Sequence, residues 1–155
     1  MNDDRAGSPE LAAVVARLRR AMRRAWRVED GGNPLSVAQL ELLTSLGEQP
    51  GARPGQLARS LRLAPNSVTT LVNGLRARGL VARDEGIGDR RTVRLTLTAA
   101  GQDAARGWQA TNAGILRDAL SDLPEPSRQA LTELVPVLRD LVEAIDRATD
   151  RTPED

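Results

Sequence analysis

Residues 65–83 read PNSVTTLVNGLRARGLVAR, and this stretch decides the fold. Pro65 is placed to open a helix and Gly79 to end it. Between them the apolar residues recur at helical spacing, at Val68, Leu71, Val72 and Leu75. After Gly79 the apolar spacing changes to the alternation of a strand. A helix is therefore predicted to lead directly into a β-hairpin.

Two shorter helices are predicted before this one. Ser36 and Gln39 form a capping-box pair at the start of the first, which is expected to end at Gly47. The second is short and has three apolar positions, Leu57, Ala58 and Leu61. Residues 62–64 then form the turn that leads to the helix described above.

The hairpin is predicted to have strands at residues 80–83 and 92–97 and a polar tip at residues 84–91. Helix, turn, helix and hairpin in this order are typical of a winged helix-turn-helix.

Longer helices are predicted at both ends of the chain. One begins at Ser8, and another is capped by Thr98. The last follows a turn at residues 122–126, and Pro136 is expected to kink it or split it in two. The predicted fold is mainly α with a small β-hairpin wing. It comprises a disordered N-terminus (1–7), a helical dimerisation lobe made from the first, fifth and sixth helices (8–33 and 99–148), a winged helix-turn-helix DNA-binding lobe (34–98) and a flexible tail (149–155).

The composition excludes several kinds of chemistry. The chain has 155 residues, 22 of them basic, all arginine, and it has no His and no Cys. Without these side chains there is no disulfide, no thiol redox switch, no usual zinc site and no imidazole base. The chain is therefore not expected to be an enzyme or to need a cofactor or metal. It has no signal-peptide core and no membrane-spanning run, so a cytoplasmic location is expected.

The charge is unevenly distributed although the net charge is only +1. Residues 53–94 hold 9 Arg and 3 acidic side chains, whereas residues 95–155 hold 6 Arg and 11 acidic side chains. A basic middle segment in a neutral chain indicates a local surface that binds anions.

The helix that begins at Pro65 is the candidate recognition helix. With its apolar residues facing the core, its outer face has short polar groups that suit base edges in the major groove. The candidate DNA contacts on it are Asn66, Ser67, Thr69, Thr70, Asn73 and Arg76. Taken singly, each of these residues is better explained by a merely solvated helix face, and it is their coincidence with the hairpin that favours DNA.

The hairpin tip provides a second candidate contact. Arg90 or Arg91 is expected to enter a narrow minor groove, with Asp89 holding one of them in position. The alternative is a solvated hairpin with a weak local ion pair.

Several of these motifs resemble the MarR family of bacterial transcription regulators. The resemblance rests on VAQLELL at 37–43, on VTTLVNGLRARGLVAR at 68–83, on Asp89-Arg90-Arg91 and on LTLTAAG at 95–101. It implies a homodimeric repressor or activator in which Arg91 is the minor-groove residue and Asp89 braces it. Two departures from the family pattern bear on local phosphate contacts: Ala64 stands where a capping Ser is common, and Arg53 where a hydroxyl cap is usual.

The terminal helices carry apolar stripes that a small winged lobe cannot cover, which independently favours a second copy of the chain as partner. The candidate dimer contacts are Leu11, Val14, Leu18, Leu131, Leu134, Leu138, Leu141 and Ile145. The alternative is packing of these helices within one chain. A two-fold dimer predicts a pseudo-palindromic operator in double-stranded DNA, with half-sites roughly 10 bp apart.

The resemblance also implies a small organic effector, often aromatic and acidic. The candidate pocket residues are Met22, Trp26, Leu42, Leu46 and Trp108. Plain core packing is the alternative for Trp26. A different class of function is also open: a winged-helix module that binds proteins and lacks specific DNA binding.

Overall fold

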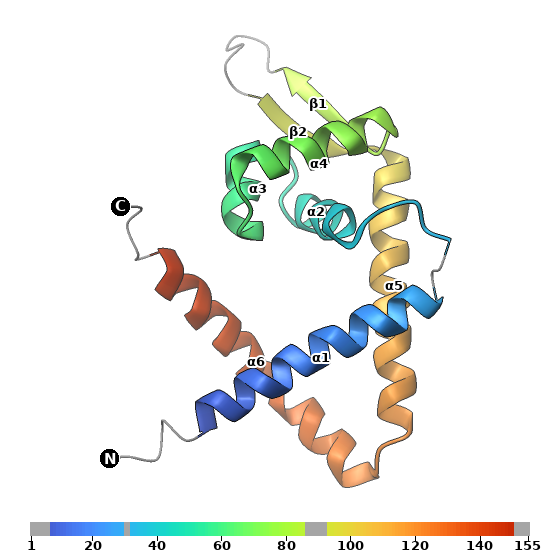
Figure 1. The fold of residues 1–155 in the computed structure, drawn as a ribbon, viewed down its shortest axis with the longest axis vertical. Helices are drawn as coiled ribbons and strands as arrows, with labels where there is room; N and C mark the ends of the chain where they lie inside the picture. Colours follow the sequence, from blue (N-terminus) through green and yellow to red (C-terminus); the bar gives the residue numbers. More distant parts are fainter. Residues whose placement is uncertain (1–6, 30–31, 86–92, 151–155) are drawn as a thin grey trace. The chain divides into compact units, whose positions relative to one another are not determined.

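The computed structural model describes residues 7–29, 32–85 and 93–150. It is mainly helical with one antiparallel hairpin, as predicted (Figure 1). The elements are α1 (Gly7–Glu29), α2 (Val37–Glu48), α3 (Pro54–Leu61), α4 (Pro65–Ala77), β1 (Val81–Glu85), β2 (Val93–Leu97), α5 (Ala99–Ser121) and α6 (Glu125–Asp150).

The chain divides into two compact units, Met1–Ile115 and Leu116–Asp155. The first holds α1 to β2 and most of α5, and the second holds the end of α5 and all of α6. Within the described ranges, no helix has the length and apolar character needed to cross a bilayer.

The core of the first unit lies between α2, α3, α4 and the hairpin, which are grouped together in Figure 1. Its fully buried side chains are Leu40, Leu42, Leu43, Leu46, Leu57, Val68, Leu75 and Leu95. Burial of a Leu or Val side chain stabilises a fold by about 1.5–3 kcal/mol. The apolar spacing in the sequence therefore predicted the inward face of α4 correctly, with Leu71 half-buried at its edge.

Local signals fix the ends of the helices. The Ser36 N–H donates to Gln39 Oε1 at 2.9 Å and the Gln39 N–H to Ser36 Oγ at 3.2 Å, which confirms the predicted capping box. Gly79 has a φ of +71°, and the Leu80 N–H donates to the Leu75 carbonyl at 3.0 Å. This is the Schellman ending that a glycine permits. It directs the chain from α4 into β1.

Thr98 connects the hairpin to α5. Its Oγ1 accepts from the Gly101 N–H at 3.1 Å and donates to the Gly79 carbonyl at 2.7 Å. The predicted helix cap is therefore present, and the same hydroxyl also ties the start of α5 to the turn after α4.

The first strand of the hairpin ends later in the chain than predicted, at Glu85. Asp84 and Glu85 were expected in the tip, but they belong to β1 and pair with Arg94 and Val93 of β2. The prediction was wrong because polar side chains are common on a strand face that meets solvent, so polarity alone does not mark where a strand ends. On its other edge β2 bonds to the segment after α2: the Gly51 N–H donates to the Leu95 carbonyl and the Leu95 N–H to the Ala52 carbonyl, both at 3.0 Å.

The predicted split of the last helix is also wrong. α6 runs as one helix from Glu125 to Asp150 with Pro136 inside it. Proline removes only the bond to the carbonyl one turn earlier, at Thr132. Because Thr132 and its neighbours are exposed, water can satisfy that carbonyl and the helix continues.

Candidate nucleic-acid interface

The turn between α3 and α4 has a defined geometry. Arg62 adopts a left-handed conformation with φ of +54°, and the Leu63 N–H donates to the Ala58 carbonyl at 3.0 Å. Pro65 then starts α4, and Ala64 provides no side-chain cap. The N-terminal end of α4 therefore keeps backbone N–H groups that a side chain has not satisfied, together with the positive end of the helix dipole.

The outer face of α4 is polar and exposed along its length. All six residues predicted from the sequence lie there: Asn66, Ser67, Thr69, Thr70, Asn73 and Arg76. None of them contributes to the core. The structure therefore brings the predicted set together on one accessible surface, which presents amide, hydroxyl and guanidinium groups.

The two threonines on this face have restricted hydrogen-bonding roles. Thr69 Oγ1 donates to the Pro65 carbonyl and Thr70 Oγ1 to the Asn66 carbonyl, each at 3.0 Å. A hydroxyl has one hydrogen, so in this conformation each can only accept from a ligand. Because phosphate oxygens are acceptors, these hydroxyls suit the amino groups of bases and do not suit the DNA backbone. The sequence alone left both uses open.

The remaining groups on α4 are available as donors. In the described part of the chain, the side chains of Asn66, Asn73 and Arg76 make no hydrogen bond or ion pair. An Asn amide presents one donor and one acceptor side by side, which matches the major-groove edge of adenine, and a guanidinium matches guanine. These are the groups on α4 best able to distinguish bases.

The predicted contacts at the hairpin tip, Asp89, Arg90 and Arg91, lie outside the described residues. The hairpin strands that lead to them carry exposed Arg83 and Arg94.

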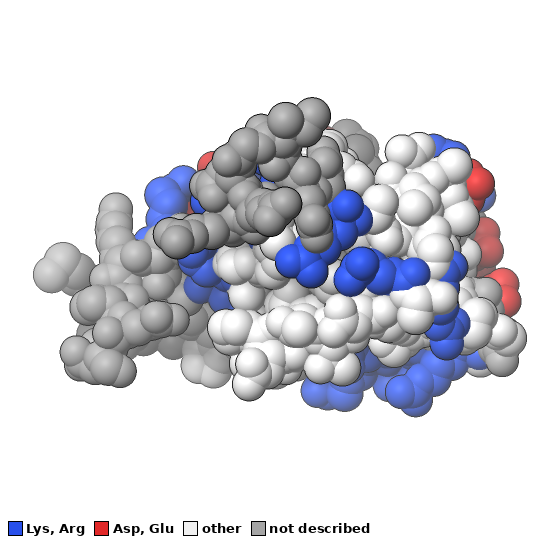
Figure 2. Space-filling model, turned by 90° about the horizontal axis from the view of Figure 1, so that it is seen from above, with Lys and Arg blue, Asp and Glu red and all other residues white. Residues whose placement is uncertain are grey.

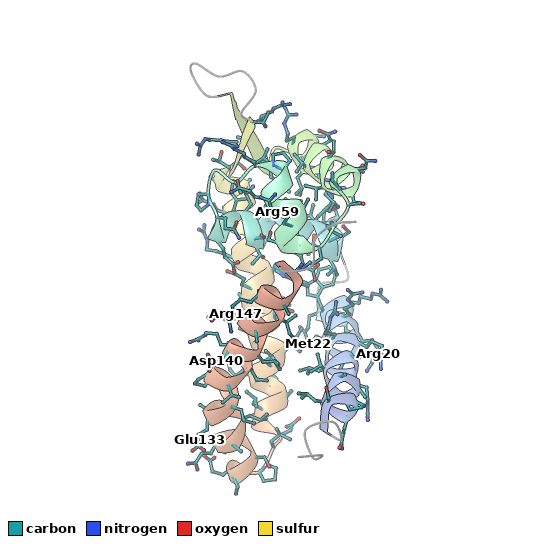
Figure 3. The ribbon with its side chains drawn as sticks, turned by 90° about the vertical axis from the view of Figure 1, so that its left-hand side faces the viewer. Arg20, Met22, Arg59, Glu133, Asp140 and Arg147 are labelled. Carbon is teal, nitrogen blue, oxygen red and sulfur yellow. The ribbon has the colours of Figure 1, made fainter. Side chains whose placement is uncertain are left out.

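An apolar pocket of about 240 Å³ lies between α1, α2 and α5 in the first unit. Two of the five predicted effector residues, Met22 (labelled in Figure 3) and Trp108, line it. The structure places Trp26, Leu42 and Leu46 in the core instead. The other lining residues are Leu18, Arg19, Arg23, Val37, Glu41 and Asn112.

The two tryptophans are in direct contact beside this pocket. Their ring centroids are 4.9 Å apart in an edge-to-face arrangement, with an interplanar angle of 77°. Trp26 is 6% exposed, and its buried indole Nε1 has no hydrogen-bond partner. Among the described residues this indole N–H has no acceptor, and a buried donor without one carries a desolvation cost.

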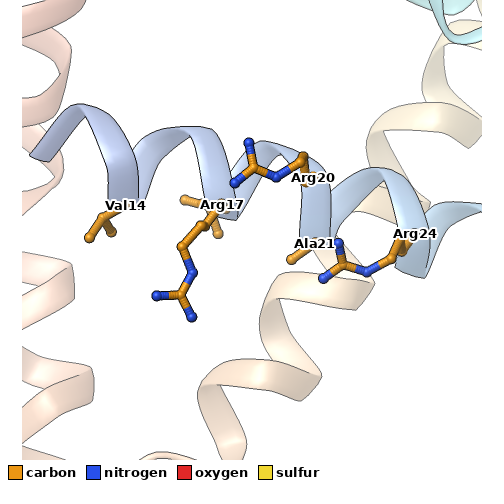
Figure 4. Close-up of a pocket in the computed structure, with 6 residues that line it drawn as sticks. Val14, Arg17, Arg20, Ala21 and Arg24 are labelled. Atoms are coloured by element: carbon orange, nitrogen blue, oxygen red, sulfur yellow. The ribbon is translucent and has the colours of Figure 1, made fainter. Parts of the chain in front are cut away.

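A second hollow follows the flank of α1 (Figure 4). Its lining residues, Val14, Arg17, Leu18, Arg20, Ala21 and Arg24, all come from this one helix. A surface formed by a single helix cannot enclose a small ligand. This hollow is therefore part of an open, amphipathic surface, and it does not qualify as a binding pocket.

The predicted dimer contacts are all exposed in the single chain. On α1 these are Leu11, Val14 and Leu18, and on α6 Leu131, Leu134, Leu138, Leu141 and Ile145. Between Glu125 and Ala148, only Arg128 is half-buried, and every other side chain is exposed. Such long apolar stripes are unusual on a monomer surface.

The sequence did not predict that one group of basic residues lies together. Arg53, Arg59 and Arg94 line a common depression, although they come from three separate places in the chain. The excess of arginine over residues 53–94 was the signal available. Only the pairing of β2 with the segment after α2 shows which of these arginines meet.

In the described ranges no group of three or more His, Cys, Asp or Glu side chains could hold a metal ion. Helix, turn, exposed polar helix and hairpin define a winged helix-turn-helix protein. A family model described as the MarR family matches residues 35–93. Over residues 35–93 the chain therefore matches the MarR family of winged helix-turn-helix transcriptional regulators, and it is similar to such regulators over most of its length.

The relatives agree with this family. An uncharacterized HTH-type transcriptional regulator of Mycobacterium leprae is 25% identical over 143 residues, which cover 92% of this chain and 97% of the relative. A MarR family protein from Bacillus stearothermophilus has a similar fold, with a TM-score of 0.74 at 22% identity over 94% of this chain and 98% of that one. FabT of Streptococcus pneumoniae, solved in complex with DNA, matches with a TM-score of 0.70 at 18% identity, over 89% and 98%. Since this family consists of transcriptional regulators, the expectation that the chain is not an enzyme is confirmed.

Proposed function

We propose that this regulator is a cytoplasmic, homodimeric repressor that binds double-stranded DNA with a pseudo-palindromic sequence near its own gene. Each subunit places α4 in the major groove and the hairpin tip in the adjacent minor groove. The observation that carries the proposal is the outer face of α4, where the side chains of Asn66, Asn73 and Arg76 are exposed and make no hydrogen bond or ion pair within the described chain. FabT, which shares the fold, was solved in complex with DNA, and this supports the same role here.

The first experiment measures binding to a duplex from the region upstream of the gene and to a scrambled duplex of equal length. A regulator of this kind should prefer the upstream duplex, and its affinity should fall steeply as salt rises, because bound cationic side chains release counterions from DNA. Equal binding to both duplexes would contradict specific regulation. No binding to either would favour the alternative, a winged-helix module that binds proteins.

The Asn73→Ala variant tests the role of α4 directly. Loss of a bidentate contact to a base should cost about 1–3 kcal/mol and should flatten the preference for the wild-type base at one operator position. The measurement is affinity for a set of duplexes with single base changes. Arg106→Ala on α5, which is exposed and pairs with Asp103, is the control and should leave the preferences unchanged. An unchanged preference in Asn73→Ala would remove Asn73 from the reading surface.

We also propose that a small aromatic acid binds in the pocket between α1, α2 and α5 and lowers DNA affinity. Apolar Met22 and Trp108 suit an aromatic ring, and Arg19 and Arg23 at the same pocket suit a carboxylate. A ligand that binds only the form of the dimer that cannot engage DNA would shift the population toward that form.

Tryptophan fluorescence tests the effector proposal. Because Trp108 lines the pocket and contacts Trp26, an aromatic acid bound there should change the emission of the protein and saturate with concentration. The Arg23→Ala variant should weaken the response by about tenfold if the guanidinium binds the carboxylate. Flat titrations across a panel of aromatic acids would count against an effector at this site.

A further inference from the structure

Three arginines meet in a depression next to the helix-turn-helix, and the function proposed above does not use them. Arg53 precedes α3, Arg59 lies on α3 (Figure 3) and Arg94 lies on β2. The rest of the lining is Gly51, Gly55 and Gln56. Among the residues whose side chains the structure describes, which exclude Asp84 opposite Arg94 on the hairpin, no carboxylate lines the depression and the three guanidinium groups make no ion pair.

The backbone brings these residues together. Because the Gly51 and Ala52 backbone bonds to Leu95, the chain entering α3 lies alongside β2, and Arg53 is brought close to Arg94. A Cβ built on Gly51 would lie 3.7 Å from an Arg94 guanidinium nitrogen, so the side chain of Arg94 reaches back over this segment. The backbone pairing therefore places the segment that carries Arg53 beside the strand that carries Arg94.

The depression is shaped for close approach by an anion. Gly51 and Gly55 have no side chains, and a Cβ at Gly55 would meet nothing within 4 Å. The Gln56 carboxamide oxygen already accepts from the Arg53 N–H at 2.8 Å, so the polar acceptor nearest the arginines is in use. What remains is a cationic hollow at the positive end of the α3 dipole.

We propose that Arg53, Arg59 and Arg94 form a phosphate clamp that holds the DNA backbone beside the groove entered by α4. The inference rests on the proposed DNA-binding function and adds residues that position the protein without reading bases. In helix-turn-helix proteins the first helix of the pair crosses the backbone, and here α3 is that helix. Figure 2, viewed from above, shows basic side chains in the middle of the visible face as well as along its lower edge and at its left, with acidic ones mainly at the right-hand margin. A DNA strand presents successive phosphates along such a surface, and each phosphate that an arginine neutralises adds to the affinity through counterion release.

The test uses the full chain and a mixed-sequence duplex, because every duplex carries phosphates. In the Arg53→Ala, Arg59→Ala, Arg94→Ala triple variant, affinity should fall at least about tenfold at physiological salt. The slope of log affinity against log salt should become less steep by about 0.9 for each phosphate that the protein no longer neutralises. Arg20→Ala on α1 is the control for removal of a surface charge and should change neither quantity appreciably.

Gly55 offers a sharper pair of variants. Since its Cβ position is open, Gly55→Ala should fold normally and bind DNA within about twofold of wild type, while Gly55→Glu places a carboxylate among the arginines and should weaken binding about tenfold. Circular dichroism checks that both variants keep the helical content of the wild type.

The results separate the clamp from the function on which it rests. If the wild type binds no duplex, the proposed function fails. If the wild type binds but the triple variant keeps its affinity and salt slope, the clamp is wrong and DNA binding stands. If the triple variant loses preference for the upstream duplex over the scrambled one, the arginines read sequence and the assignment to phosphates is overturned.

Discussion

At the scale of single residues, Gly101 is the described glycine at which an added Cβ would meet the closest atom. A Cβ built there would lie 2.0 Å from the backbone oxygen of Leu80, a distance that real Cβ atoms do not reach. The contact joins the first turn of α5 to the turn between α4 and β1. Gly101 therefore sets how closely the hairpin lies against the helix that follows it.

The Gly101→Ala variant should lose about 2–4 kcal/mol of unfolding free energy, because the clash is with backbone and no side chain can rotate away. Gly107 in the same helix is the matched control, since a Cβ there meets nothing within 4 Å. Gly107→Ala should gain about 0.5–1 kcal/mol from helix propensity. Urea unfolding followed by circular dichroism measures both. Equal stability of Gly101→Ala and wild type would show that the turn relaxes easily.

The sequence predicted which residues of α4 lie on its outer face. It did not predict the hydrogen bonds that their side chains make. Apolar spacing places Thr69 and Thr70 outside, because the buried face of a helix fixes the opposite face. That each hydroxyl donates to a carbonyl one turn earlier depends on side-chain rotamers. Likewise, nothing in the sequence indicates that the indole N–H of Trp26 is buried without a partner, because that depends on what packs around it.

At the scale of elements, α6 has an apolar side that the proposed dimer would cover. Its large apolar side chains recur at helical spacing on one side, yet they are exposed, with Leu134 at 46% and Leu138 at 45%. Acidic side chains such as Glu133 and Asp140, labelled in Figure 3, lie elsewhere on the helix. A second copy that covers the apolar side would remove it from water and leave the charged side solvated.

The Leu138→Glu variant should therefore weaken the proposed dimer by about 100-fold or more, because a carboxylate would be buried at the interface. Thr132→Glu is the control, since helical spacing places Thr132 away from the stripe. Size-exclusion chromatography with light scattering reports the mass of each variant. A Leu138→Glu protein with the mass of the wild-type dimer would show that this stripe lies outside the interface.

Most elements were predicted from periodicity and caps, and the exceptions have physical reasons. The helix-turn-helix was predictable because its apolar spacing, capping box and Gly79 all favour the same structure. Asp84 and Glu85 were misplaced because backbone pairing between strands does not require apolar side chains, so polarity alone does not mark where a strand ends. Pro136 does not split α6, because a missing hydrogen bond is tolerable where water reaches the backbone, and the predicted kink stays a prediction. The clamp arginines were missed because their proximity depends on the pairing between β2 and Gly51–Ala52.

At the scale of the whole molecule, the charge distribution matches the proposed roles of DNA binding for the winged helix-turn-helix and dimerisation for the terminal helices. The segment 53–94 has 9 Arg against 3 acidic residues and contains α3, α4, β1 and the start of β2. The segment 95–155 has 11 acidic residues and contains α5 and α6. In the proposed function, the basic segment attracts DNA toward α4. The acidic segment disfavours binding in other orientations.

Footprinting of the upstream duplex with dimethyl sulfate, which methylates guanine N7 in the major groove, tests directly whether a dimer reads DNA with two copies of α4. Two protected patches, centred roughly 10 bp apart and related by an inverted repeat, are predicted because the dimer places one recognition helix at each half-site. The Asn73→Ala variant should lose protection at both patches together. A single patch, or specific binding with every guanine N7 still open to methylation, would contradict this mode of recognition.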